Sequence, residues 1–208
     1  ESLSGQCGET QYTTSRCPEM SRVIRKYHSR DLEACLGIYR ANFEAGLIPD
    51  HYEDDFLEVL NSTEILTLVL IDDGKVLGCG SISCSWQGST LSANLSYGLI
   101  HPDHHRKKLG SYLLVSRLSL LAESRAGGVV SLIAIKGSVG FYSDVVGFTE
   151  YDQTKDEFGN RFHELYLKVG RRSHQDAIDY MAASGFEMDP ALRVPMTSQN
   201  SVGLWSWD

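Results

Sequence analysis

The 208-residue sequence lacks the features that mark several common classes of protein. It has no apolar run approaching the roughly 20 residues needed to span a bilayer, and its first residues do not show the pattern of a signal peptide. Positive charge is scarce, because 19 lysines and arginines stand against 27 acidic residues, for a net charge of −8. This balance argues against general binding to nucleic acids or to anionic membranes. We therefore expect a cytoplasmic globular protein with one main domain.

Cysteine is sparse and irregularly spaced. The five cysteines form no C-x-x-C pair and no pattern of zinc ligands. Cys7 and Cys17 lie in a polar amino-terminal stretch, whereas Cys35, Cys79 and Cys84 lie in segments that should form a helix and a strand. We expect buried structural thiols in a reducing compartment. A disulfide between Cys7 and Cys17 stays open as an alternative.

The order of the predicted elements indicates an α+β fold, with a mixed, largely antiparallel central sheet flanked by helices. Residues 1–20 lack hydrophobic periodicity and predict a flexible arm, 21–170 form the main domain, and 171–208 form a carboxy-terminal helix and tail. The expected strands cover residues 21–27, 65–71, 76–86, 91–100, 129–136, 148–154 and 162–169, and the expected helices cover 29–45, 49–60, 110–125, 139–146 and 173–184.

Two patterns within these elements predict which side chains are buried. In the strand 91–100, the odd positions are mostly apolar and the even positions are small or polar. The odd face should therefore pack on a helix, and the even face should line a wetter cleft. In the helix 110–125, Leu114, Leu118 and Leu121 form an apolar stripe, and Arg117 lies away from it.

Residues 97–114 are the most informative part of the sequence. A short apolar strand leads into a loop marked by Pro102, and a helix begins near Gly110. The loop concentrates positive charge in residues 104–108 (His-His-Arg-Lys-Lys). Backbone N–H groups at the start of a helix have no partners within the helix, and the helix dipole adds partial positive charge there. The segment therefore predicts a site for a phosphate-bearing ligand. A solvated basic loop is the alternative.

These residues resemble the GNAT superfamily of acyl-coenzyme A-dependent N-acyltransferases. The cofactor signature of that family is Gln/Arg-x-x-Gly-x-Gly/Ala, placed after a strand and a Pro-containing loop and opening a long helix; residues 105–110 (HRKKLG) are its counterpart here. A second family signature is a short helix that carries a tyrosine and ends in Gly-Phe, which residues 141–148 (FYSDVVGF) resemble. The order and spacing of the elements from residue 21 to about 169 are similar as well.

The resemblance implies an N-acetyltransferase that uses acetyl-coenzyme A as co-substrate, without a metal, and transfers the acetyl group to a primary amine by direct attack in a ternary complex. The backbone of Gly98, Leu99 and Ile100 would face the pantetheine arm of the cofactor. Tyr142 would be the catalytic acid that returns a proton to the coenzyme A thiolate. The pyrophosphate would lie at the helix start, on the cofactor-binding residues His105, Arg106, Lys107, Lys108, Leu109, Gly110 and Ser111.

The sequence also departs from the family pattern. His105 replaces Gln or Arg, and Lys108 replaces the first glycine, so the Lys108 side chain must turn outward to leave room for a pyrophosphate. Tyr142 lies one residue further from Gly147 than the family spacing, which would put Ser143 in the place of the acid unless a local bulge restores Tyr142. No general base is evident. The candidates, each of which fits a surface charge as well, are Glu44, His51, Asp54, Asp55 and His101.

Several alternatives stay open. The acceptor would be a small-molecule amine or a peptide amine, with no nucleic-acid or membrane partner, and a homodimer is left open. Because the cofactor signature is altered and no base is evident, a catalytically inactive GNAT-like domain could instead act as an acyl-CoA sensor or as an interaction module. His101, His104 and His105 would suit a metal ion if a distant ligand joined them. Trp205 and Trp207 in the tail would dock on the domain or on a partner chain.

Overall fold

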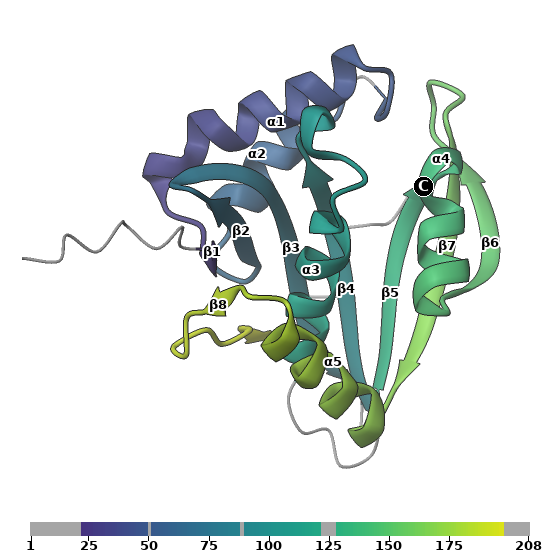
Figure 1. Cartoon of the computed structure of the whole chain (residues 1–208). Coiled ribbons are helices and arrows are strands. Elements are labelled where there is room, and N and C mark those ends of the chain that lie inside the picture. The colour runs from purple at the N-terminus through teal and green to yellow at the C-terminus, as the bar shows by residue number, and fades with distance from the viewer. Residues whose placement is uncertain (1–21, 50, 88–89, 122–127, 198–208) are drawn as a thin grey trace, which may run out of the picture.

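The computed structural model describes residues 22–49, 51–87, 90–121 and 128–197, which fold around one central sheet (Figure 1). The sheet has nine strands in the order β6-β7-β5-β4-β3-β2-β1-β8, with β9 pairing to β3 off this path. Strands β4 and β5 run parallel, as do the short pairs β1–β8 and β3–β9, and the other neighbours are antiparallel. The predicted α+β class with a largely antiparallel sheet is confirmed.

The observed elements lie within a few residues of their predicted positions. The strands are β1 (Arg22–Lys26), β2 (Leu66–Asp72), β3 (Lys75–Gln87), β4 (Thr90–Ile100), β5 (Gly128–Ile135), β6 (Thr149–Lys155), β7 (Arg161–Val169), β8 (Glu187–Met188) and β9 (Met196–Thr197). The helices are α1 (Leu32–Glu44), α2 (Glu53–Asn61), α3 (Leu109–Ser119), α4 (Lys136–Gly140) and α5 (Arg171–Ala183), with shorter turns η1 (Ser29–Asp31), η2 (Pro102–His104) and η3 (Phe141–Val146).

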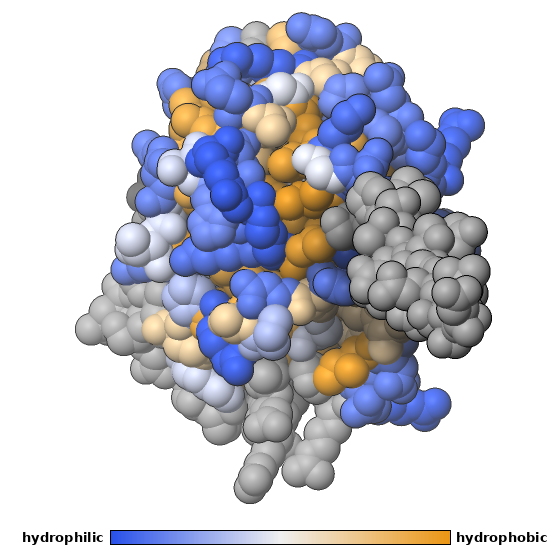
Figure 2. Space-filling model, turned by 60° about the vertical axis from the view of Figure 1, so that its left-hand side comes forward, coloured by the Kyte–Doolittle hydropathy of each residue, from blue (hydrophilic) through white to orange (hydrophobic). Residues whose placement is uncertain are grey.

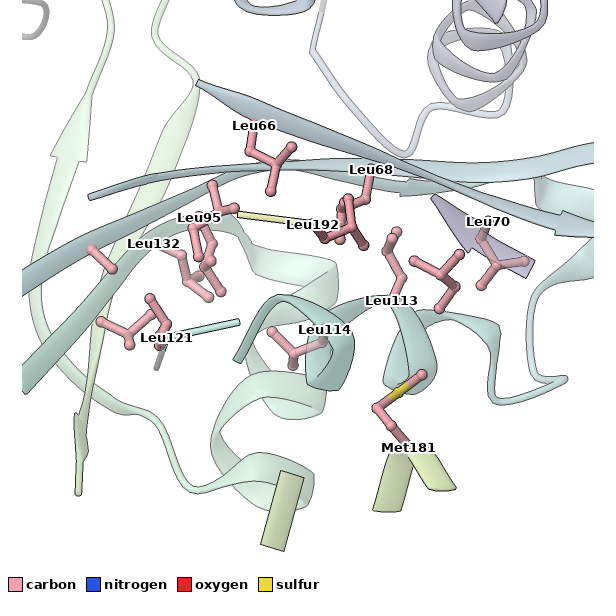
Figure 3. Close-up of a cluster of buried hydrophobic side chains, with 14 of the residues drawn as sticks. Leu66, Leu68, Leu70, Leu95, Leu113, Leu114, Leu121, Leu132, Met181 and Leu192 are labelled. Carbon is pink, nitrogen blue, oxygen red and sulfur yellow. The ribbon is translucent and has the colours of Figure 1, made fainter. Parts of the chain in front are cut away.

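Hydrophobic residues cover the sheet on both faces. Alternate residues of β2 belong to two separate clusters, since Leu66, Leu68 and Leu70 pack with α3 and Val69 packs with α1 and α2. Figure 3 shows the first cluster, in which Leu113 of α3 lies among leucines of the sheet. On the outer surface, Figure 2 shows apolar residues as a band between hydrophilic ones. The apolar run of β2 is therefore explained by burial on both faces.

The faces of β4 exchange at a β-bulge, which corrects the predicted alternation. Leu91 and Leu95 pack in the α3 cluster, as expected, but Tyr97 and Leu99 pack in the α1–α2 cluster on the opposite face. The pairing of β4 with β3 shifts register at this point, and Tyr97 has a φ of 45°. An extra residue in one strand of a pair moves every later side chain to the other face. The odd positions therefore do not share one face along the whole strand.

The buried face of α3 also differs from the prediction. Arg117 is only 2% exposed, although the leucine spacing placed it away from the apolar stripe. Its guanidinium donates to backbone carbonyl groups, which lie both within α3 and on the strands below. Leu114 and Leu121 are buried as predicted. A polar side chain can face the core when its donors are satisfied there.

The segment from Arg171 to Thr197 packs against the same core. Met181 and Phe186 are buried in the α3 cluster, and β8 and β9 add to the sheet. Cys35, Cys79 and Cys84 are buried thiols, as predicted. The residues considered for a disulfide, Cys7 and Cys17, lie outside the described residues, as do Trp205 and Trp207. Across the described ranges, no helix is long and apolar enough to cross a membrane.

Candidate active site

Strands β4 and β5 diverge, and this divergence places the candidate site. They pair only from Leu91–Leu95 on β4 to Gly128–Leu132 on β5, although β4 continues to Ile100 and β5 to Ile135. Figure 1 shows the two strands separating toward their carboxyl ends. Along Gly98–Ile100, the backbone that the resemblance assigns to a pantetheine arm, β4 therefore does not pair with β5.

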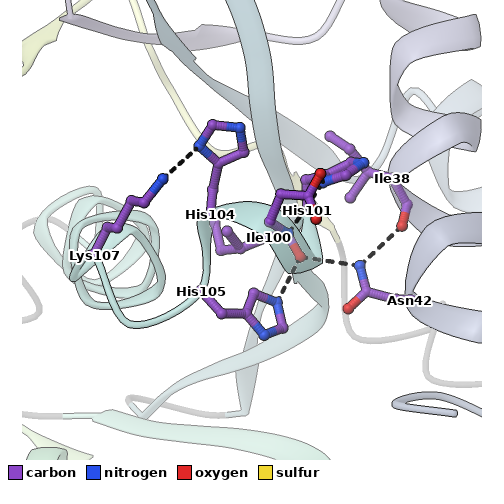
Figure 4. A network of polar contacts seen from close by, with 8 residues as sticks. Ile38, Asn42, Ile100, His101, His104, His105 and Lys107 are labelled. Atoms are coloured by element: carbon purple, nitrogen blue, oxygen red, sulfur yellow. Dashed lines mark hydrogen bonds and ion pairs between the residues drawn. The ribbon is translucent and has the colours of Figure 1, made fainter. Parts of the chain in front are cut away.

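The end of β4 is clamped by two side chains (Figure 4). The Ile100 carbonyl accepts a hydrogen bond from Asn42 Nδ2 at 3.0 Å and another from His105 Nε2 at 2.8 Å. Asn42 is buried on α1 and also donates to the Ile38 carbonyl at 2.8 Å. The departure at His105 thus has a structural reason: its ring holds the loop against the strand end.

The loop between β4 and α3 bends sharply. Arg106 and Lys108 both adopt left-handed backbone conformations, with φ values of 61° and 62°. Left-handed backbone favours glycine, which accounts for the glycine that the family places at the position of Lys108. The Lys108 side chain is exposed. A Cβ at Gly110 would meet only ordinary contacts, 3.9 Å from Ile100 Cγ1 and 4.0 Å from Phe141 Cζ. A methyl group at Gly110 would therefore fit at the first turn of α3 without displacing a neighbour.

A π-helical turn lies where the sequence required a bulge. Residues Phe141–Val146 form this turn, η3, directly after α4. A π-turn inserts one extra residue into a helix, which matches the extra residue between Tyr142 and Gly147. The Ser143 hydroxyl donates to the Val139 carbonyl at 2.7 Å, so it is engaged by its own helix. The half-buried Tyr142 ring packs at the edge of Phe148, with 5.7 Å between ring centroids. The π-turn is the local bulge that the prediction of Tyr142 as the acid needs, and the role of Tyr142 stays a prediction.

The even positions of β4 form a polar surface on the face opposite α3, as predicted. Ser92, Asn94 and Ser96 are half-buried there. Asn94 Nδ2 lies 3.3 Å from the Ser131 hydroxyl, which links β4 to β5 below the point where the strands diverge. Ile133, two residues further along β5, is 47% exposed. The resemblance would place an acceptor on this surface, which we call the acceptor surface.

Two segments far apart in the sequence meet beside this surface. The Tyr52 hydroxyl, just before α2, donates to Asp156 Oδ2 at 2.6 Å in the β6–β7 turn. The His51 ring stacks on Phe158 of the same turn, with 4.3 Å between centroids. Burial and then the Asp156 hydrogen bond raise the pKa of Tyr52. The α1–α2 segment and the β6–β7 turn are thus joined by an aromatic and a polar contact.

The predicted base candidates do not converge on one point. Glu44, His51 and Asp54 are exposed. Asp55 is half-buried, and its negative charge adds to the effect of burial in raising the pKa of Tyr97 at the bulge. His101 is half-buried at the end of β4, with its ring 3.8 Å from an Asp103 oxygen. Asp55, which acts on Tyr97, and His101, which directly follows Ile100, lie close to the diverging end of β4.

Sequence reasoning missed the carboxylate of Glu164. It lies on β7, paired in register with Ile133, and is half-buried. The Tyr151 hydroxyl donates to Glu164 Oε2 at 2.6 Å, and this bond, with desolvation, raises the pKa of Tyr151 to about 12. Because paired residues in a sheet share a face, Glu164 belongs to the same surface as Ile133. Residues 161–169 (RFHELYLKV) do not alternate regularly between apolar and polar, so no clear signal in the sequence indicated this placement.

The histidines considered as a metal site have different partners, although the rings of His101 and His104 meet edge to face with 6.0 Å between centroids. His105 is bonded to the Ile100 carbonyl, and His104 Nδ1 lies 3.4 Å from Lys107 Nζ. No group of three or more His, Cys, Asp or Glu side chains in the described part of the chain is arranged to hold a metal ion. The metal alternative is therefore not supported by this geometry.

A sheet that opens between two parallel strands, beside the start of a helix that follows a basic loop, defines the fold class of the GNAT N-acetyltransferases. No family model matches the sequence, and no curated protein matches it. Several solved structures are similar to it in fold.

The PaiA N-acetyltransferase from Thermoplasma acidophilum, in complex with coenzyme A, is 21% identical over 72% of this chain and 100% of that chain, with a TM-score of 0.55. A GNAT family acetyltransferase from Brucella melitensis, in complex with acetyl-CoA, is 22% identical over 73% of this chain and 90% of that one, with a TM-score of 0.52. FeeM, an N-acyl amino acid synthase from uncultured soil microbes, is 17% identical over 72% and 93%, with a TM-score of 0.57. At these identities the likeness concerns the fold alone: the chain has the GNAT N-acetyltransferase fold.

Proposed function

We propose that this protein transfers an acetyl group from acetyl-coenzyme A to a primary amine. The divergence of β4 from β5 carries the proposal, because it leaves this edge of β4 without a partner strand beside the start of α3. A ligand with an amide-containing arm and a phosphate end can bond to both features at once. The bound coenzyme A and acetyl-CoA of the PaiA and Brucella melitensis structures support this reading.

Different residues around the β4–α3 loop would bind different parts of the cofactor. The backbone of Gly98–Ile100 would bond to the pantetheine amides. The first N–H groups of α3, at Leu109, Gly110 and Ser111, would bind the pyrophosphate, since no side chain caps this helix end. The exposed side chains of Arg106, Lys107 and Lys108 would add positive charge. His105 would act indirectly, by fixing the loop on Ile100.

The chemistry follows from these positions. The acceptor amine attacks the thioester carbonyl carbon, and β4 backbone N–H groups stabilise the negative charge on the carbonyl oxygen. The intermediate collapses with cleavage of the carbon–sulfur bond. The Tyr142 hydroxyl gives its proton to the departing thiolate, and the nitrogen loses its proton through water to a carboxylate. Glu164 suits this last role because it is half-buried on the acceptor surface.

The charge around the acceptor surface favours a cationic amine. The carboxylates of Asp55 and Glu58 act on Tyr97, and those of Asp156 and Glu157 act on Tyr52. An amine that arrives as an ammonium ion would be attracted to this set and then deprotonated. Charge reversal at Asp55 (Asp55→Lys) should therefore raise the KM for the amine more than the KM for acetyl-coenzyme A.

Calorimetric titration with acetyl-coenzyme A tests the proposal. Wild type should bind with micromolar affinity, and Gly110→Glu should lose binding because a carboxylate would occupy the pyrophosphate site. Gly110→Ala is the matched control for folding, since a Cβ there meets only ordinary contacts. Absence of binding in wild type would refute the proposal. If binding is observed, release of free thiol with a panel of amines separates a transferase from a domain that binds the cofactor without turnover.

A further inference from the structure

Aromatic rings flank a carboxylate on the acceptor surface. Phe162, Glu164 and Tyr166 are alternate residues of β7, so their side chains share one face of the sheet. Glu164 pairs with Ile133 of β5, which places this face on the acceptor surface. Leu165, between Glu164 and Tyr166, is buried on the opposite face, in the α3 cluster. Along the acceptor surface, β7 therefore presents a ring, a carboxylate and a second ring.

A third ring comes from the segment before α2. The Tyr52 ring meets the Phe162 ring edge to face, with 5.9 Å between centroids. Tyr52 is held at both ends, because its hydroxyl donates to Asp156 Oδ2 at 2.6 Å and its carbonyl accepts from the Tyr97 hydroxyl at 3.5 Å. Asp156 is fixed in turn by the Asn160 N–H, which donates to it at 2.7 Å. The Tyr52 ring is therefore a preorganised wall beside Phe162.

A fourth ring lies on the other side of the carboxylate. The Tyr151 hydroxyl donates to Glu164 Oε2 at 2.6 Å, and its ring meets the Tyr166 ring with 5.9 Å between centroids. Large apolar side chains stay exposed around this group: Tyr151 is 57% exposed, Ile133 47%, and Phe158 in the β6–β7 turn 54%. Exposed apolar groups that gather on one face mark a binding surface.

Negative charge dominates the same face. Asp152 of β6 pairs with Glu164, so two carboxylates lie side by side there. The next residue on this face of β7 beyond Tyr166 is Lys168, which pairs with Val129 at the end of β5 where β4 and β5 are still joined. The cation thus lies away from the divergence. An ammonium group is attracted to the carboxylates and to the faces of the rings, and further ring surface is left for the rest of an acceptor.

We propose that the acceptor is an arylalkylamine, a primary amine joined to an aromatic ring by a short alkyl chain. Its ammonium group lies at Glu164, and its ring packs against Tyr52 and Phe162. Edge-to-face or offset contacts between rings stabilise a complex beyond the effect of the apolar area that they bury. A polyamine carries charge along its whole length and would not make these contacts. The inference deepens the proposed function and rests on it.

Two acceptors of similar shape test the proposal. Release of free thiol from acetyl-coenzyme A is measured with phenethylamine and with cyclohexylethylamine, which has a similar length but no π system; spermidine and a short peptide represent other classes of amine. Phenethylamine should have the highest kcat/KM. The ratio of its kcat/KM to that of cyclohexylethylamine should fall roughly 3- to 10-fold in Phe162→Leu. Comparing this ratio between proteins cancels the intrinsic difference in reactivity of the two amines.

Tyr180→Leu is the matched control, because it removes an exposed ring on α5, and it should leave the ratio unchanged. Tyr52→Leu is the second variant if Phe162→Leu does not fold, and it should lower the ratio in the same way. An unchanged ratio in the folded variant would overturn the proposal. A higher kcat/KM for spermidine or for the peptide than for phenethylamine would overturn it as well, and would leave acetyl transfer to an amine in place.

A binding measurement separates this inference from the proposed function. Calorimetry of phenethylamine and of cyclohexylethylamine, each titrated into the protein with coenzyme A present, needs no turnover. Tighter binding of phenethylamine without thiol release would support the acceptor class and refute the transfer. Thiol release without this difference in affinity or in kcat/KM would support the transfer and overturn the acceptor class.

Discussion

The hydrogen bonds of Asn42 and His105 to the Ile100 carbonyl should contribute both to the stability of the fold and to cofactor binding. Asn42 is 4% exposed and donates both amide protons, to Ile38 at 2.8 Å and to Ile100 at 3.0 Å. In Asn42→Ala neither carbonyl becomes isolated, because Ile38 keeps its partner in α1 and Ile100 keeps His105. Two hydrogen bonds at a net 0.5–1.5 kcal/mol each predict a loss of about 1–3 kcal/mol in the free energy of unfolding.

The isosteric variant Asn42→Asp separates this reasoning from simple loss of packing. A carboxylate fills the same volume but points oxygens at the two carbonyl groups, and it leaves a buried charge without a partner. We therefore expect a larger loss, about 3–5 kcal/mol. The variant should recover stability as the pH falls, because burial raises the pKa of an aspartate and its neutral form can donate. Urea unfolding, followed by circular dichroism, measures both variants.

Asn61→Ala is the matched control for Asn42. Asn61 Nδ2 donates to the Leu57 carbonyl at 2.9 Å in the same helical geometry, but its side chain is exposed on α2. Its removal should change stability by less than about 0.5 kcal/mol. Asn42→Ala should also weaken binding of acetyl-coenzyme A, because His105 alone would then hold the loop. An Asn42→Asp variant as stable as Asn42→Ala would refute the assignment of the amide as a double donor.

Three further predictions concern a salt bridge, the strained loop and the core. Asp31 accepts bonds from Arg25 at 2.7 and 2.9 Å and from the His28 N–H at 2.8 Å, and the Arg25 contact chiefly lowers its pKa. A carboxyl group whose pKa is lower in the folded state stabilises the fold at pH values above its pKa in the unfolded chain, about 3.9. This stabilisation is lost as the pH falls through the pKa of the folded state. Urea unfolding should therefore show Asp31→Asn about 2–3 kcal/mol less stable at pH 7 and a much smaller difference near pH 2; a gap that persists there would contradict the linkage. Lys108→Gly should match or exceed wild type by up to about 1 kcal/mol in the same assay, since it relieves a φ of 62°; a clear loss of stability would show that the left-handed backbone is not strained. Leu113→Ala removes a fully buried side chain and should cost about 3 kcal/mol, seen as a lower midpoint of thermal unfolding; an unchanged midpoint would argue against its place in the core.

The sequence predicts most of the fold because turn residues and hydrophobic periodicity depend only on residues that are close together in the chain. The Asp73-Gly74 turn shows this well, since both residues adopt the positive φ values that a tight hairpin needs. The basic loop and the start of α3 were found in the same way, from a run of charges before a helix. The extra residue before Gly147 also predicted a local irregularity, which is the π-helical turn η3.

The missed features all depend on contacts between distant segments. Nothing in the alternation of residues 91–100 marks the bulge at Tyr97, because a bulge is defined by the register of the partner strand. Arg117 counts as a surface residue on a helical wheel, and its hydrogen bonds to the carbonyls of Ser81 and Ser96, on distant strands, help to make its burial tolerable. Glu164 shares a face of the sheet with Ile133 because β7 pairs with β5, and no local sequence pattern indicates which strand pairs with β7.

The short pairing of β4 with β5 has a mechanical consequence. The block of β1–β4 and the block of β5–β7 share five residue pairs, between Leu91–Leu95 and Gly128–Leu132. This seam is the place where the empty protein should open first, with amide hydrogen exchange fastest among the central strands. A ligand arm that forms hydrogen bonds to both blocks would act as an additional strand and link β4 to β5 where they do not pair. Occupancy would then turn two loosely coupled blocks into one that unfolds as a unit.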